Sequence, residues 1–178
     1  MKKTLFSLVA MCVMFLLASC GGNSLEGTWK VNPKDVLGEE VSQFDKCEML
    51  FTFDGGNVDI TLDCSGTTGQ NAMTMDLGFT MDIKGKYKQK DQELTLDFNG
   101  AKPEVDIYKF KINADEATQQ ILASMGMDEK TMKKSFQEQI EGSDFTGEMA
   151  IGKLTIKSLE GDKMVLENEG KEVNLTRK

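Results

Sequence analysis

Between residues 73 and 83 the chain alternates strictly between large apolar side chains and small or polar ones. A period of two is typical of a β-strand with one buried and one solvated face, and it argues against an amphipathic helix. The same period dominates the chain from Gly27 onward, so we expect a mainly β protein. The apolar positions of this clearest segment are Met73, Met75, Leu77, Phe79, Met81 and Ile83.

A second alternating segment, residues 47–64, has the turn sequence Asp54-Gly55-Gly56-Asn57 at its centre. A two-residue loop at Gly55-Gly56 predicts a β-hairpin in which paired residue numbers sum to 111, as 55 and 56 do. This register places Met49 and Phe51 on an apolar face. It also sets Cys47 opposite Cys64, at a non-hydrogen-bonded position where a disulfide is geometrically allowed.

Further strands are expected in sequential hairpins along the rest of the chain. One hairpin has its turn near Lys90-Asp91 and pairs Tyr87 with Leu94 and Ile83 with Phe98. Another joins the last two strands at Glu169-Gly170. The remaining strands are expected at about 105–112, 148–158, 163–168 and 171–177, which makes eight or nine strands in a single domain spanning residues 27–178.

Two short amphipathic helices interrupt this pattern before the last strands. The first is expected to begin at a capping box of Asn113 and Glu116 and to end at Gly126, and its apolar face carries Ala117, Ile121, Leu122 and Met125. The second is expected to begin near Asp128 and to end at Gly142, with Met132, Phe136 and Ile140 on one face. We expect both faces to pack on the sheet, and a partner-binding surface is the alternative.

The N-terminal segment is typical of a secretory signal peptide, because two lysines precede an apolar run from Leu5 to Leu17 that is too short to span a bilayer comfortably. The run ends in Leu17-Ala18-Ser19-Cys20, which resembles the lipobox of bacterial lipoproteins. This resemblance implies that residues 1–19 are removed, that Cys20 is lipidated and that residues 20–26 form a tether. An ordinary signal peptide with an incidental cysteine is the alternative.

The lipoprotein resemblance also implies a location. Retention at the inner membrane would need an acidic residue directly after the cysteine, and Gly21 stands there instead. We therefore expect the outer membrane of a Gram-negative bacterium. The segment after Cys20 also lacks the acidic run that favours surface display, so we expect the periplasmic face.

Charge and composition limit the partners. Of 21 basic side chains, Lys2 and Lys3 leave with the signal peptide, so 19 remain against 29 acidic ones and the net charge becomes −10. Such a chain is a poor partner for nucleic acid, and anionic lipid headgroups repel it, so membrane attachment depends on the acyl chains. Histidine is absent, which excludes His-dependent catalytic triads and His-containing zinc sites.

An antiparallel sheet of eight or nine strands hides its edges best by closing into a barrel. The first expected strand, Gly27-Thr28-Trp29-Lys30-Val31, resembles the Gly-x-Trp opening of lipocalins and the wider calycin group. The turn after Phe53, the strand Gly85-Lys86-Tyr87 and the closing residues 173–178 resemble small bacterial lipocalin-like lipoproteins. The two helices before the last strands depart from that pattern.

The lipocalin resemblance implies that a basic residue of the last strand lies over the tryptophan of the first. The chain has one tryptophan and one arginine, Trp29 and Arg177, so we expect them to meet at the base of the barrel. A terminal arginine that projects freely into solvent is the alternative.

The expected function is binding of a small hydrophobic ligand inside the barrel or at its mouth. Nine of the 12 methionines remain after residues 1–19 are removed, and flexible methionines line adaptable sites as well as irregular cores. The alternative is a structural or protein-interaction envelope lipoprotein with a filled barrel. The residues expected to line a ligand are Met49, Phe51, Met73, Met75, Leu77, Phe79, Met81, Tyr87 and Met164.

Catalysis is not expected. Asp59, Asp63, Asp76 and Asp82 alternate with apolar residues in the manner of a solvated strand face. The sequence contains no phosphate-binding loop, nucleophile elbow or clustered metal ligands, so we assign no catalytic residue, metal or cofactor. A carboxylate pair for glycoside chemistry is the enzymatic alternative.

The cysteines provide a direct test of the hairpin register. Cys47 and Cys64 are the two cysteines left once Cys12 is removed and Cys20 is acylated, and in an oxidising compartment we expect a structural disulfide rather than a redox or metal-binding pair. Thiol titration of the denatured, unreduced mature protein should detect no free thiol, and reduction should release two. Two free thiols before reduction would contradict the pairing.

Overall fold

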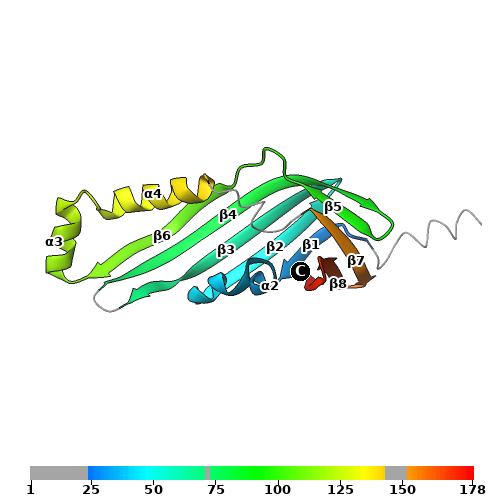
Figure 1. Ribbon diagram of the computed structural model, residues 1–178, viewed down its shortest axis with the longest axis horizontal. Coiled ribbons are helices and arrows are strands. Elements are labelled where there is room, and N and C mark those ends of the chain that lie inside the picture. Colours follow the sequence, from blue (N-terminus) through cyan, green and yellow to red (C-terminus); the bar gives the residue numbers. More distant parts are fainter. Residues whose placement is uncertain (1–23, 71–72, 143–151) are drawn as a thin grey trace, which may run out of the picture.

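The computed structural model describes residues 24–70, 73–142 and 152–178 (Figure 1). The described residues are mainly β, as the alternation predicts. The strands are β1 (Gly27–Val31), β2 (Lys46–Asp54), β3 (Asn57–Gln70), β4 (Met73–Lys90), β5 (Glu93–Asp97), β6 (Glu104–Ala114), β7 (Lys153–Glu160), β8 (Lys163–Asn168) and β9 (Lys171–Arg177). The helices are α2 (Pro33–Leu37), the 3₁₀ segment η1 (Gly38–Gln43), α3 (Glu116–Ser124) and α4 (Glu129–Glu141).

Eight of these strands close into an antiparallel barrel, which confirms the predicted architecture. Hydrogen-bonded neighbours follow one another as β1, β2, β3, β4, β5, β7, β8 and β9, and β9 returns to β1. The closing register pairs Trp29 with Arg177 and Val31 with Leu175. Closure removes the open edges within the barrel, which is the usual reason for a barrel.

The ninth strand, β6, lies outside the barrel because β4 changes partner along one side. Lys86–Lys90 of β4 pair with β5, whereas Met73–Asp82 pair with β6. β3 pairs with β4 along its whole length, so β3, β4 and β6 extend past the barrel as a three-stranded sheet (Figure 1). Sequential hairpins would instead have paired β5 with β6, and that expectation is wrong because β5 pairs with β7.

The hairpin of β2 and β3 has the predicted register, with Cys47 opposite Cys64 and Phe51 opposite Ile60. The register predicted for the hairpin of β4 and β5 is wrong, because Tyr87 pairs with Leu96 and not with Leu94. Its turn lies at Asp91-Gln92, one residue later than expected, and Asp91 adopts a φ of 55°. The shift brings Phe98 over Gly85, where a Cβ atom would come within 2.5 Å of the ring.

The predicted bounds hold for the last two strands, whereas β7 spans Lys153–Glu160 in place of the expected 148–158. β8 and β9 span the expected residues and meet at Glu169-Gly170, both with positive φ. β7 begins at Lys153, and residues 148–151 of the strand expected there lie outside the described residues. At the other end the folded body begins before the predicted boundary at Gly27, because Leu25 is part of the core.

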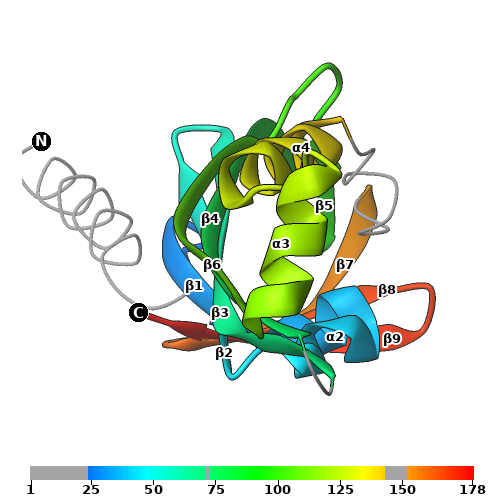
Figure 2. The ribbon, with the colours of Figure 1, turned by 90° about the vertical axis from the view of Figure 1, so that its left-hand side faces the viewer.

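The helices behave differently from each other. Asp115, rather than the predicted Asn113, caps α3 by accepting a hydrogen bond from the Thr118 amide, and Asp128 caps α4 as expected. α4 packs on the extension, with the ring of Phe136 6.2 Å from that of Phe79. α3 lies across the end of the molecule (Figure 2), beyond the sheet. The predicted packing of its apolar face is therefore wrong, and Ile121 is 59% exposed.

This contrast predicts unequal stabilities for two variants. Phe136→Ala removes a half-buried ring and should lower the free energy of unfolding by about 1–2 kcal/mol, less than the ~3–5 kcal/mol of a fully buried phenylalanine. Ile121→Ala should change it by no more than about 0.5 kcal/mol, because α3 offers little contact to lose. Urea unfolding measures both, and equal losses would contradict the placement of α3.

Candidate ligand-binding site

One end of the barrel, which we call the closed end, is held by the predicted pair of Trp29 and Arg177. The Arg177 Cζ atom lies 4.2 Å from the centroid of the Trp29 ring, which is fully buried. The indole Nε1 donates to the carbonyl of Leu25 at 2.7 Å. The guanidinium donates to the carbonyls of Glu26 at 2.5 Å and Ser24 at 2.7 Å. Arg177 thus holds the segment before β1 against the barrel.

Glycine is required where this segment enters β1. Gly27 adopts a φ of 118°, and a Cβ atom there would come within 2.7 Å of the Arg177 Nη1 atom. Next to it, the Tyr87 hydroxyl donates to Glu26 at 2.5 Å. Burial of the phenol, together with the neighbouring Glu26 carboxylate, raises the pKa of Tyr87 to about 12. Tyr87 therefore lies at the base of the barrel, where its hydroxyl binds Glu26.

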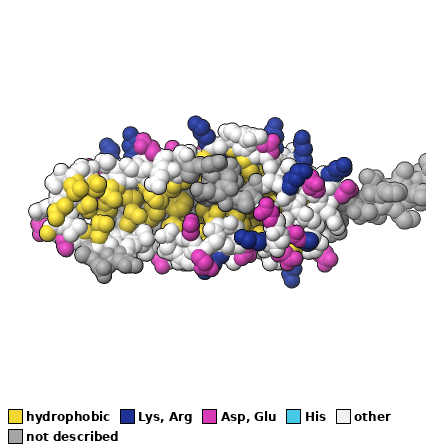
Figure 3. All heavy atoms as spheres, in the orientation of Figure 1, with side chains coloured by type: hydrophobic (Ala, Val, Ile, Leu, Met, Phe, Trp, Pro, Cys, Tyr) yellow, Lys and Arg dark blue, Asp and Glu magenta, His cyan; other side chains and the backbone are white. Residues whose placement is uncertain are grey.

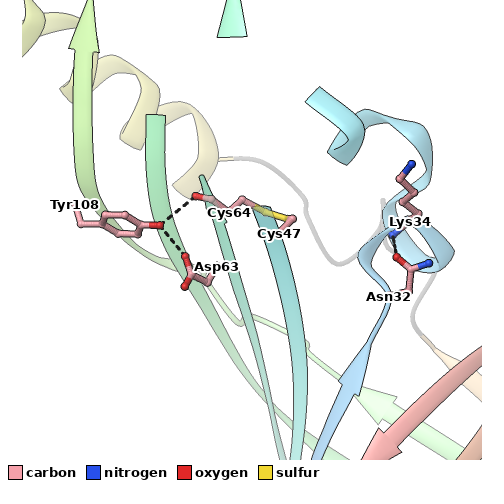
Figure 4. The surroundings of a disulfide bond; sticks show 6 residues. All are labelled: Asn32, Lys34, Cys47, Asp63, Cys64 and Tyr108. Atoms are coloured by element: carbon pink, nitrogen blue, oxygen red, sulfur yellow. Dashed lines mark hydrogen bonds between the residues drawn. A yellow bond between two sulfur atoms is a disulfide. The ribbon is translucent and has the colours of Figure 1, made fainter. Parts of the chain in front are cut away.

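The predicted disulfide lies away from this end, on β2 and β3 (Figure 4). Cys47 and Cys64 are bonded, with their Cα atoms 4.1 Å apart. The Tyr108 hydroxyl donates to Asp63 at 2.8 Å and reaches the Cys64 carbonyl at 3.5 Å (Figure 4). Burial, and then the hydrogen bond with Asp63, raises the pKa of Tyr108. The disulfide and Tyr108 together fix the positions of β3 and β6 where the extension begins.

The interior of the barrel is packed. Met49 and Met164 are fully buried, and Met81 is almost so. A cavity of about 110 Å³ remains, which is small beside the ~300–1,000 Å³ of a typical ligand pocket. Of the residues expected to line a ligand, Phe51 borders this cavity, whereas the three methionines are core residues. The lining residues are Val31, Asp35, Val36, Phe51, Leu96, Leu154, Leu166, Asn168, Lys171, Val173 and Leu175.

A larger cavity of about 440 Å³ lies between η1 and the inner face of β3 and β4, and we call it the mouth cavity. Phe79 forms part of its wall, and its ring also contacts Phe44 edge-on, 5.7 Å between centroids. Two polar side chains, Glu40 and Gln43, belong to the lining. The complete lining is Leu37, Glu40, Val41, Gln43, Phe44, Leu62, Cys64 and Phe79.

The other predicted lining residues do not meet around one cavity. Met73 is 41% exposed in the extension, Met75 is half-buried and Leu77 belongs to the core. The alternation that singled them out continues past the barrel into the extension, and Met73 and Met75 line neither the barrel cavity nor the mouth cavity. Figure 3 shows a band of hydrophobic side chains that begins at α3 on this side of the molecule.

No element was expected at α2 and η1, the segment that covers the mouth cavity. Its start has a recognisable signal, because Asn32 accepts a hydrogen bond from the Lys34 amide (Figure 4) and Pro33 opens the helix. Leu37, Val41 and Phe44 also follow the spacing i, i+4, i+7 of a helical apolar face. The adjacent residues Val36 and Leu37 line the barrel cavity and the mouth cavity respectively.

The described residues contain no group of three or more acidic or cysteine side chains that could hold a metal ion. None of the helices within residues 24–70, 73–142 and 152–178 is long and apolar enough to cross a membrane.

Fold and cavities together define a small antiparallel β-barrel protein with a packed interior and a cavity at its mouth that has both apolar and polar lining. No protein-family model, curated protein or solved structure matches the chain. The resemblance to lipocalin-like lipoproteins therefore stays a prediction.

The closed end generates a stability prediction. Arg177→Lys removes the forked hydrogen bonds to the carbonyls of Ser24 and Glu26 as well as the stacking on Trp29, and it should lower the free energy of unfolding by about 1–3 kcal/mol. Lys178→Met is the matched control, because its ion pair with Glu48 is exposed and contributes at most about 1 kcal/mol. Fluorescence of Trp29 follows unfolding, and equal effects of the two variants would contradict the role of Arg177.

Proposed function

We propose that this protein is a lipid-anchored bacterial envelope lipoprotein that binds a small hydrophobic ligand in its mouth cavity. The observation that carries the proposal is the difference between the two cavities. The mouth cavity, at about 440 Å³, lies within the usual range of ligand pockets, whereas the barrel cavity of about 110 Å³ does not. Apolar side chains supply most of the mouth lining, so an apolar ligand would replace water against Phe44, Leu62 and Phe79.

The sequence supports the anchor in this proposal. The lipobox-like residues Leu17 to Cys20 favour acylation of Cys20, and Gly21 together with the lack of an acidic run after Cys20 favours the periplasmic face of an outer membrane. Arg177 holds the chain from Ser24 onward, so the tether would comprise residues 20–23 rather than 20–26. Four residues span at most about 14 Å, which would keep the closed end near the membrane surface.

The alternative proposal is a structural or protein-interaction lipoprotein. Two observations favour it, namely the small volume of the barrel cavity and the exposure of apolar residues on α3, where Ile121 and Met125 are 59% and 62% exposed. A protein that acts in this way would show no saturable uptake of small hydrophobic compounds.

Binding of the neutral fluorescent probe N-phenyl-1-naphthylamine tests the proposal. Val41→Trp fills the mouth cavity and should weaken saturable binding at least about tenfold, because the probe's apolar rings lose their site. Val173→Phe, which fills the barrel cavity, is the matched control and should leave binding unchanged. Leu37→Ser provides a second mouth variant if Val41→Trp unfolds.

Three results would contradict the mouth as the binding site. Loss of binding in Val173→Phe alone would place the ligand inside the barrel. Unchanged binding in folded Val41→Trp and Leu37→Ser would exclude the mouth cavity. No saturable binding by the wild-type chain would favour the protein-interaction alternative.

A further inference from the structure

Glu40 is the one charged side chain in the lining of the mouth cavity. It lies in η1 and is exposed to solvent at the rim, and within the described residues it forms no ion pair. No lysine or arginine contributes to the lining. A ligand that fills the cavity would therefore meet a carboxylate at the rim and no compensating positive charge.

The neighbouring Glu39 differs from Glu40 in its contacts. It accepts a hydrogen bond from the Ser42 hydroxyl at 2.8 Å and pairs with Lys34 at 3.5 Å, and these contacts lower its pKa. Lys34 is thereby engaged next to Glu39, which does not line the cavity. Lys34 and Lys46, each six positions from Glu40, are the nearest basic residues in sequence, and neither lines the cavity.

We propose that the mouth cavity selects a single-chain amphiphile with an amine or ammonium head group, whose chain lies against Phe44, Leu62 and Phe79 and whose head group pairs with Glu40. This inference rests on the proposed function, since it names the class of ligand for the same cavity. The apolar wall of the cavity binds the alkyl chain of the ligand. It contributes little to the choice between head groups. Glu40 attracts a cation and repels an anion, and the net charge of −10 acts in the same direction.

A fatty acid is disfavoured by the same geometry. Its carboxylate would lie beside Glu40 without a basic partner, or it would have to stay in water and withdraw part of its chain from the cavity. An uncharged alcohol of equal chain length suffers neither penalty and gains no attraction. The expected order of affinity is therefore amine, alcohol, carboxylate.

Displacement of N-phenyl-1-naphthylamine by dodecylamine, dodecanol and dodecanoate tests this order at low ionic strength, below the concentration at which any of them forms micelles. The protein used is residues 21–178, which contain the whole barrel and carry no acyl chains. We expect dodecylamine to bind about threefold to fivefold more tightly than dodecanol, and dodecanoate to bind more weakly than dodecanol by a similar factor. Added salt should reduce both differences in affinity, because it screens the charges.

Variants at the rim separate Glu40 from the general charge of the protein. Glu40→Gln should bring dodecylamine close to dodecanol, and Glu40→Lys should reverse the order of amine and carboxylate. Glu160→Gln is the matched control, since it removes the same charge at an exposed position outside the cavity lining and releases no lysine, and it should preserve the order. Both positions are exposed, so these variants should fold as the wild-type chain does.

The outcomes distinguish this inference from the proposed function. Absence of saturable probe binding overturns the proposed function and the inference with it. Saturable binding with equal displacement by the three compounds, or with dodecanoate as the tightest ligand, overturns the inference alone. A preference for the amine that survives in Glu40→Gln as fully as in Glu160→Gln also overturns it, because the attraction would then come from the whole protein.

Discussion

The change of partner along one side of β4 is the constraint on which the rest of the architecture depends. Buried backbone donors and acceptors need partners, and β5, with five residues, is too short to pair with all 18 residues of β4. β6 supplies the missing partners beyond the barrel. The resulting extension gives α4 a surface to pack on and provides one wall of the mouth cavity.

The two ends of the barrel are built from different chemistry. At the closed end, Arg177 and Tyr87 bind the segment before β1 through short hydrogen bonds, so the base is held by directional contacts. At the mouth the covering element is η1, a 3₁₀ segment in which Val41 is the one buried residue. Hydrogen-bond geometry in a 3₁₀ helix is poorer than in an α-helix, and few buried contacts secure it. The mouth is therefore the end of the barrel that can adapt most easily to a ligand.

The sequence predicts the parts of this fold that depend on local rules. A two-residue glycine turn fixes its hairpin register, and Cys47 therefore lies opposite Cys64. The predicted register of the β4–β5 hairpin is wrong because Asp91 adopts a positive φ, which an aspartate does not require. Partner changes between distant strands leave no periodic signal, so neither the extension nor the exposure of α3 could be foreseen. The candidate site depends on α2 and η1, which a period of two does not predict, although Asn32 and Pro33 mark where they begin.

The pairing of β1 with β9 also determines when the barrel can close. Glu26 and Arg177 are 151 positions apart in the chain yet share a hydrogen bond, so this contact has nearly the longest sequence separation the chain allows. Contacts of such separation form late, because the entropy of closing a long loop opposes them until the intervening hairpins are in place. Until the last strand is available, Trp29 has no cover and β1 presents an unpaired edge. A chain that ends before Arg177 would thus hold most of its hairpins and remain an open, aggregation-prone sheet.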